Sequence, residues 1–129
     1  MSMRLYFMIG IGGMIGAVAR YTVSLTFVEY ESFPYATLFT NFTGCFFLTF
    51  LLNSHYVRQK LSMQTRTALT TGVIGSFTTF STFALETARI WDSQVFIAII
   101  YILLSVFGGV IFCYVGYKVA TYEKRSDII

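Results

Sequence analysis

Four apolar runs, each about the length needed to cross a lipid bilayer, occupy most of this 129-residue chain. A membrane-spanning helix needs roughly 20 apolar residues, and the runs cover residues 5–28, 36–52, 67–88 and 95–117. Hydrophobic residues make up 56% of the chain and charged residues 12%, which is about half the charged share of an average soluble domain. The sequence therefore predicts an all-α membrane protein, a single domain of four transmembrane helices.

Basic residues are concentrated on one side of this predicted topology. An even number of spans places both termini beside the connection between the second and third spans. That side carries Arg4, Arg58, Lys60, Arg66, Lys118, Lys124 and Arg125. The other side has only Arg89 near it, in the short link expected at residues 89–93, and the acidic residues Glu29, Glu31, Glu86 and Asp92. Because Lys and Arg accumulate in cytoplasmic loops, we expect both termini in the cytoplasm. Basic residues at span ends anchor to lipid headgroups, so nucleic-acid binding is not expected.

The third run contains a polar cluster at membrane depth. Residues 75–83 read Gly-Ser-Phe-Thr-Thr-Phe-Ser-Thr-Phe, which places five hydroxyls in nine residues. Isolated Ser and Thr bond to their own helix carbonyls, but this cluster favours a break in the helix, because Gly and Thr lower helix propensity. Broken helices offer carbonyls to ions. Without a carboxylate in the cluster, Na⁺ is expected there rather than Ca²⁺ or Mg²⁺.

Two phenylalanines lie on the polar cluster itself. Phe80 and Phe83 are three residues apart, which would place them on one helical face. Paired Phe in a membrane protein usually packs or faces lipid, but the polar surroundings favour rings whose positive edges contact an anion. Weak binding of this kind suits conduction, which requires both entry and exit.

Small residues in the first run precede an arginine. Gly12, Gly13, Gly16 and Ala17 form small-xxx-small pairs, which allow helices to approach closely. Arg20 follows Gly16 by four residues, on the same helical face. The guanidinium of Arg20 either extends to the membrane interface or bonds carbonyls and polar side chains of a neighbouring helix.

The fourth run carries a polar or small stripe, because Tyr101, Ser105 and Gly109 recur every four residues. Helix packing alone could explain this spacing. Cys45 and Cys113 lie in separate apolar runs and show no metal-ligand spacing, so a packing role is expected for both.

The runs lack side chains that other functions would require. No Asp or Glu occurs in a run before Glu86, whereas proton-coupled transporters generally use an intramembrane carboxylate. The main alternative, a small multidrug-resistance-type transporter, would need a Glu in the first run. A non-transporting assembly subunit is a second alternative, but it leaves the hydroxyls and paired Phe unexplained. The sequence has no phosphate-binding loop or Ser-His-Asp set, and an enzyme is not expected.

Three motifs carry a resemblance to a known family. The first span contains Gly13-x-x-Gly16-Ala17-x-x-Arg20, the second contains Thr37-Leu38-x-x-Asn41-x-x-Gly44-x-Phe46, and the third contains Gly72-x-x-Gly75-x-x-Thr78-Thr79-Phe80-Ser81-Thr82-Phe83. Together these motifs resemble the bacterial fluoride channels of the Fluc/CrcB family. The resemblance extends over essentially the whole chain, and the third motif is the most specific.

The resemblance implies an antiparallel dimer with two fluoride pores in the bacterial inner membrane. It implies a structural, non-transported Na⁺ held by the backbone carbonyls of Gly75 and Thr78. The fluoride path would be lined by Asn41, Phe80, Phe83, Ser81, Thr82, Tyr101 and Ser105. Arg20 would have a structural or vestibule role. Gly109 departs from the pattern, since some members have Ser there.

The charge bias leaves the identity of the dimer partner open. An antiparallel homodimer requires the chain to insert in both orientations, which is expected only when Lys and Arg are evenly divided. Here the count is seven against one, leaving Arg20 aside. The family also includes pairs of oppositely oriented paralogues, so the resemblance allows either a homodimer or a heterodimer. In both cases we expect passive export of fluoride.

Overall fold

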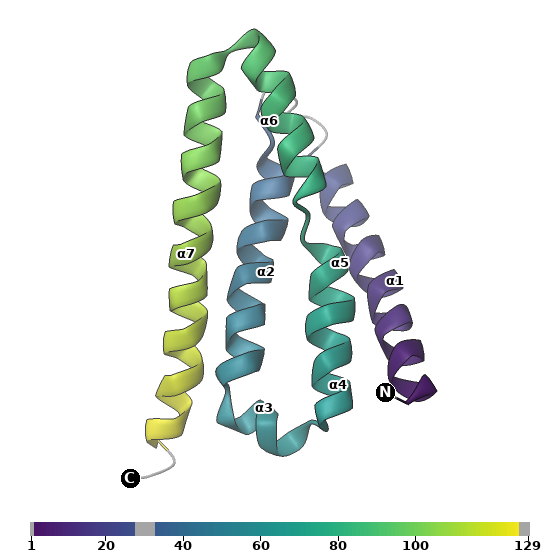
Figure 1. Ribbon diagram of the computed structural model, residues 1–129. Helices are drawn as coiled ribbons and strands as arrows, with labels where there is room; N and C mark the ends of the chain where they lie inside the picture. Colours follow the sequence, from purple (N-terminus) through teal and green to yellow (C-terminus); the bar gives the residue numbers. More distant parts are fainter. Residues whose placement is uncertain (1, 28–32, 127–129) are drawn as a thin grey trace.

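The computed structural model describes residues 2–27 and 33–126, with the side chains of 123–126 left aside, and all regular structure in these residues is helical (Figure 1). Four segments are long and apolar enough to cross a membrane: Met3–Thr26, Tyr35–Asn53, Met63–Ser93 and Val95–Tyr122. The predicted all-α architecture with four membrane-spanning helices is confirmed. The predicted end of the first span at Val28, and the acidic residues Glu29 and Glu31, lie outside the described residues.

The helices divide unevenly among the spans. The first, second and fourth spans each consist of one helix, namely α1 (Met3–Thr26), α2 (Tyr35–Asn53) and α7 (Val95–Ser126). The third span contains α4 (Met63–Thr67), the π-helix η1 (Ala68–Ile74), α5 (Gly75–Phe77) and α6 (Ser81–Ser93). Helical structure stops after Phe77, where Thr78 is extended (φ −79°, ψ 159°), and resumes at Ser81.

Short capped helices form the basic connection between the second and third spans. The helix α3 (His55–Lys60) begins after Ser54, whose Oγ accepts the Val57 N–H at 3.3 Å. The helix α4 begins after Ser62, whose Oγ accepts the Thr65 N–H at 3.2 Å. Serine favours such N-cap positions because its side-chain oxygen accepts a backbone N–H that has no helical partner.

The connection between the third and fourth spans is shorter than the sequence indicates. The link predicted at residues 89–93 is wrong, because α6 remains helical through Ser93. The turn falls at Gln94 (φ −150°, ψ 79°), whose N–H donates to the Ile90 carbonyl at 2.6 Å. Polar residues at the end of α6 are exposed, so the helix continues without burying them.

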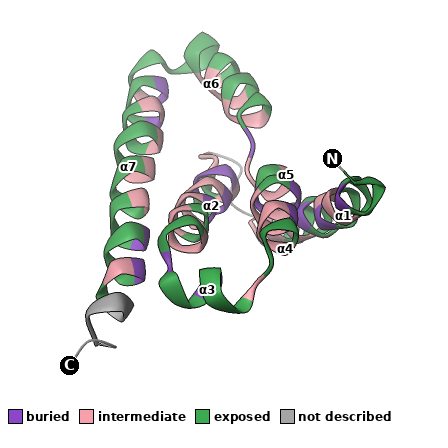
Figure 2. Cartoon of the chain, turned by 60° about the horizontal axis from the view of Figure 1, so that its bottom comes forward, coloured by how far each residue is buried: buried purple, intermediate pink, exposed green. Residues whose placement is uncertain are grey.

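The spans lie side by side in a fixed order. Figure 1 shows α2 between α7 and the third span, with α1 on the other side of the third span; α2 packs against α7, and α1 packs against η1 and α5. The start of α1, the helices α3 and α4, and the end of α7 lie at one end of the bundle. Figure 2 shows the buried residues of α7 and α2 on the faces between the helices.

Glycines allow the closest helix contacts. A Cβ atom at Gly12 would lie 2.8 Å from the Ala68 carbonyl oxygen, and one at Gly16 would collide with the Val73 carbonyl oxygen. The predicted role of the small residues in the first span, close approach to another helix, is therefore confirmed at these two positions, and the neighbour is η1. On α7, Gly116 meets the backbone of α2 in the same way.

Candidate functional site

The non-helical segment between α5 and α6 is held by a side chain from α2. The N–H of Thr79 donates to Asn41 Oδ1 at 2.8 Å, and Asn41 Nδ2 donates to the Thr79 carbonyl at 3.0 Å. The Asn41 amide thus gives the backbone N–H and C=O of Thr79 the hydrogen-bond partners that they would otherwise have in a helix. One turn along α2, a Cβ atom at Gly44 would collide with the Thr78 side chain. The backbone of α2 therefore lies directly against the segment.

Thr79 also begins the helix that follows the segment. Its Oγ1 accepts the Thr82 N–H at 3.1 Å and donates to Thr82 Oγ1 at 3.0 Å. The first of these bonds satisfies an N-terminal N–H of α6 in the manner of an N-cap. Only 9% of Thr79 is exposed. The sequence motif contains Thr79, but the spacing alone does not indicate that this residue joins α2 to the start of α6.

Two carbonyls in this region lose the partners of a continuous helix. In an α-helix the carbonyl of Gly75 would accept the Thr79 N–H, and that of Thr78 would accept the Thr82 N–H. These N–H groups instead donate to Asn41 Oδ1 and Thr79 Oγ1. Within residues 2–27 and 33–126, no other backbone N–H outside a helix donates to either carbonyl. Both carbonyls therefore lack the N–H partner that a continuous α-helix would supply.

A cavity of about 430 Å³ lies against the segment. It is lined by four of the predicted pore residues, Asn41, Phe80, Phe83 and Ser105, and by the predicted Na⁺ ligands Gly75 and Thr78. The Phe80 and Phe83 ring centroids are 5.9 Å apart, with the rings tilted by 49°. Phe80 is 79% exposed. The fold thus gathers residues from the second, third and fourth spans around one cavity.

The other predicted site residues do not line this cavity. Tyr101 is fully buried and its ring centroid lies 5.2 Å from that of Phe83. Thr82 and Arg20 line a second cavity of about 310 Å³. Ser81 is exposed, and its Oγ lies 3.4 Å from Thr79 Oγ1. Thr79 lines both cavities, so both adjoin the non-helical segment.

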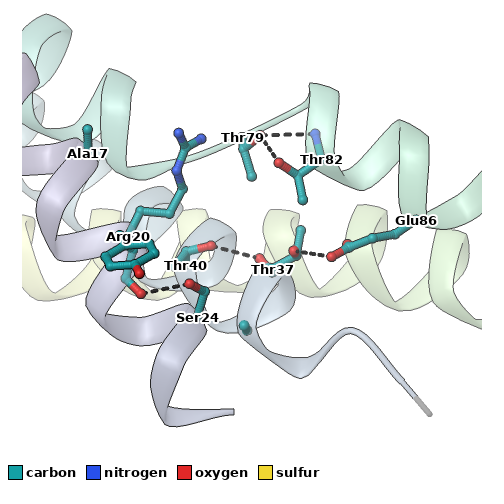
Figure 3. A pocket seen from close by; sticks show the side chains of 10 residues that line it. Ala17, Arg20, Ser24, Thr37, Thr40, Thr79, Thr82 and Glu86 are labelled. Carbon is teal, nitrogen blue, oxygen red and sulfur yellow. Dashed lines mark hydrogen bonds between the residues drawn. The ribbon is translucent and has the colours of Figure 1, made fainter. Parts of the chain in front are cut away.

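Glu86 is the centre of the hydrogen bonds at the second cavity (Figure 3). Its Oε1 accepts from Thr37 Oγ1 at 3.0 Å, and its Oε2 accepts from the Tyr101 hydroxyl at 2.8 Å. Arg20 of α1 extends its guanidinium towards the segment that carries Thr79 (Figure 3). Sequence reasoning placed Glu86 at the end of a span and missed this role, although a carboxyl in an apolar run is itself a signal of function.

Comparisons with known proteins identify the family of this chain. The family model described as CrcB-like protein, Camphor Resistance (CrcB), matches residues 7–117. The chain is 40% identical over 127 residues to the fluoride-specific ion channel FluC 1 of Bacillus thuringiensis, covering 96% of this chain and 93% of that protein. It is 39% identical over 114 residues to the fluoride-specific ion channel FluC 1 of Desulfitobacterium hafniense, covering 88% and 100%.

A third relative, the fluoride-specific ion channel FluC of Oceanobacillus iheyensis, is 38% identical over 128 residues, which cover 98% of this chain and 99% of that protein. Four segments that are long and apolar enough to cross a membrane, together with the family match, define a multi-pass protein of the cell membrane. The chain belongs to the CrcB family. The family resemblance seen in the sequence motifs is confirmed.

Proposed function

We propose that this protein is a fluoride-selective channel that passively exports F⁻ from the cytoplasm, and that it is not an enzyme. One observation carries the proposal: Asn41, Phe80, Phe83 and Ser105 meet around one cavity beside the interrupted third span. The similarity to fluoride-specific ion channels supports the choice of ion.

The cavity offers several weak donors to an anion. Fluoride is small and strongly hydrated, so a narrow path must replace its water with hydrogen-bond donors. The Asn41 amide has two N–H groups, of which one donates to the Thr79 carbonyl and the other can serve the ion. The Ser105 hydroxyl and the positive ring edges of Phe80 and Phe83 add to it. No Lys or Arg is among the residues lining this cavity, so binding stays weak enough for exit.

The second cavity would continue the path. Thr79 lines both cavities, while Thr82 and Arg20 line the second one. In this proposal Thr82 and Ser81 supply hydroxyls along the route, and Arg20 raises the local anion concentration in a vestibule. Tyr101 supports the route through its ring contact with Phe83, since its hydroxyl donates to Glu86.

The membrane potential supplies the driving force. HF crosses membranes as a neutral acid and dissociates in a near-neutral cytoplasm. An inside-negative potential then drives F⁻ outward, with roughly 2.3 kcal/mol per charge for each 100 mV. No coupling ion is required. In keeping with this, the residues that line the cavity at Phe80 include no Asp or Glu, whereas Glu86 at the second cavity accepts hydrogen bonds from Thr37 and Tyr101.

A structural Na⁺ and an antiparallel partner subunit belong to the same proposal. The carbonyls of Gly75 and Thr78 are free of helical N–H partners, and backbone carbonyls at unwound helices suit Na⁺. Gly75, Phe80 and Ser81 are exposed in the single chain. Irregular backbone at membrane depth must be covered by protein or line a cavity, so a second subunit would cover this face.

Fluoride efflux from liposomes tests the proposal. The purified protein, reconstituted with Na⁺ present, should release F⁻ but not Cl⁻ when a potential is applied, as measured with ion-selective electrodes. Phe80→Ile and Phe83→Ile should each reduce F⁻ flux by about tenfold or more, because ring edges are lost from the path. Phe107→Ile is the matched control, since Phe107 is 62% exposed on α7. A lack of F⁻ flux, both alone and with an oppositely oriented paralogue, would contradict the proposal.

A further inference from the structure

Two cysteines from different spans face each other. Cys45 on α2 and Cys113 on α7 are neighbours across the contact between these helices, and both are free. A Cβ atom built at Gly109 would lie 3.6 Å from Cys45 Sγ. Gly109 is one turn before Cys113, so the Cys45 sulfur points at the face of α7 that carries both residues. The fold therefore creates a dithiol that the sequence spacing does not indicate.

The dithiol lies in apolar surroundings with an access route. Cys45 lines the 430 Å³ cavity together with Leu48 and Val106, and no charged residue is among the lining residues. Both cysteines are half-buried rather than sealed within the protein. On the same pair of helices, the rings of Phe42 and Phe112 stack with their centroids 5.0 Å apart. A small neutral solute in the cavity can reach Cys45.

We propose that Cys45 and Cys113 together form an intramembrane binding site for a soft, thiophilic divalent metal ion. Thiolates select soft metals over hard ones such as Mg²⁺ and Ca²⁺, and two opposed sulfurs suffice for an ion that favours linear coordination. The described residues contain no group of three or more metal-binding side chains, so the site is two-coordinate.

Charge balance decides which ions fit. Two thiols and one Hg²⁺ give a neutral bis-thiolate complex and release two protons. A neutral complex suits this apolar site, since burying a net charge without a partner is costly. A monovalent soft ion bound to both thiolates would instead leave one negative charge within the membrane. The site is therefore specific for the divalent ion.

Mercuric chloride is the probe, applied to the full-length protein in detergent. We expect wild type to take up one Hg²⁺ per chain, with a mercury–thiolate charge-transfer absorption and loss of both thiols in a thiol count after unfolding. The second thiolate binds intramolecularly, so wild type should retain Hg²⁺ on the order of a hundredfold better against a competing monothiol than Cys45→Ser or Cys113→Ser. The double variant should take up none.

Three results would overturn the proposal. The first is equal retention of Hg²⁺ by wild type and the single variants. The second is uptake of two Hg²⁺ per chain, and the third is the loss of both thiols to a disulfide with no metal bound. The Cys45→Ala and Cys113→Ala variants give the same comparison if a serine hydroxyl impairs folding. No readout depends on fluoride flux, so this proposal and the proposed channel function stand or fall separately.

Discussion

Single side chains join the interrupted third span to its neighbours, and Asn41 is the first example. Its amide pairs with both backbone groups of Thr79, and a buried group left without a partner costs about 1–3 kcal/mol. We therefore expect Asn41→Ala to lower the free energy of unfolding by at least that amount. Thr43→Ala is the control, because the Thr43 side chain has no hydrogen bond within the described part of the chain. Denaturation in mixed detergent micelles measures the unfolding free energy of both variants. Equal stability of Asn41→Ala and Thr43→Ala would contradict the pairing of Asn41 with Thr79.

Tyr101 is the second example at this scale. Its hydroxyl donates to Glu86 Oε2 at 2.8 Å from a fully buried ring. Tyr101→Phe keeps the ring contacts but leaves that oxygen without its donor, so the unfolding free energy should fall by about 1–3 kcal/mol. Tyr114→Phe should have no effect, since Tyr114 is 58% exposed. The melting temperatures of Tyr101→Phe and Tyr114→Phe, each compared with wild type in the same detergent, check this prediction. A similar shift in both variants would contradict a stabilising bond from Tyr101 to Glu86.

At the scale of elements, α6 depends on a residue outside it. Thr79 Oγ1 accepts the Thr82 N–H, and loss of an N-cap oxygen costs about 0.5–2 kcal/mol. We expect Thr79→Val, which preserves the side-chain shape, to destabilise the protein by that amount, whereas Thr79→Ser keeps the oxygen and retains most of the stability. Hydrogen exchange of the first turn of α6 reports the local effect. Equal exchange in the two variants would exclude a capping role.

Packing between α1 and the third span gives a second prediction for the elements. A Cβ atom at Gly16 would collide with the Val73 carbonyl oxygen, which is backbone and cannot move away cheaply. Gly16→Ala should therefore destabilise the fold by about 1–3 kcal/mol through overpacking. At Gly109 a Cβ atom meets only Cys45 Sγ at 3.6 Å, so Gly109→Ala should be tolerated. Thermal unfolding followed by size-exclusion chromatography measures the folded fraction of each variant. Equal loss of folded protein in Gly16→Ala and Gly109→Ala would refute the close approach of α1 to η1.

The elements also show how far sequence reasoning reaches. The four spans could be predicted because apolar runs of this length have one stable solution in a bilayer. The π-helix at Ala68–Ile74 could not, because no local propensity specifies it. The Gln94 turn was misplaced because the polar residues before it suggested a loop. The bonds of Glu86 join residues from three spans, and hydrophobic periodicity carries no information about such pairs.

At the scale of the whole molecule, the exposed polar face and the charge distribution make opposing demands. Gly75, Phe80 and Ser81 are exposed on the third span, and an antiparallel second subunit would cover them. The start of α1, the helices α3 and α4, and the end of α7 lie together, and this end collects seven of the nine Lys and Arg residues. Such an asymmetry favours a single orientation in the membrane, whereas an antiparallel homodimer needs two.

We therefore predict that the chain, expressed alone, inserts with its C-terminus in the cytoplasm, as its Lys and Arg bias favours. A protease-cleavable C-terminal tag should be cut in inside-out vesicles and protected in right-side-out vesicles. An N-terminal tag is the control and should behave identically, because four crossings return the chain to the same side. Cleavage of half the tags in each type of vesicle would contradict the prediction. It would show that the Lys and Arg bias does not fix orientation here, and that both orientations needed for an antiparallel homodimer are present.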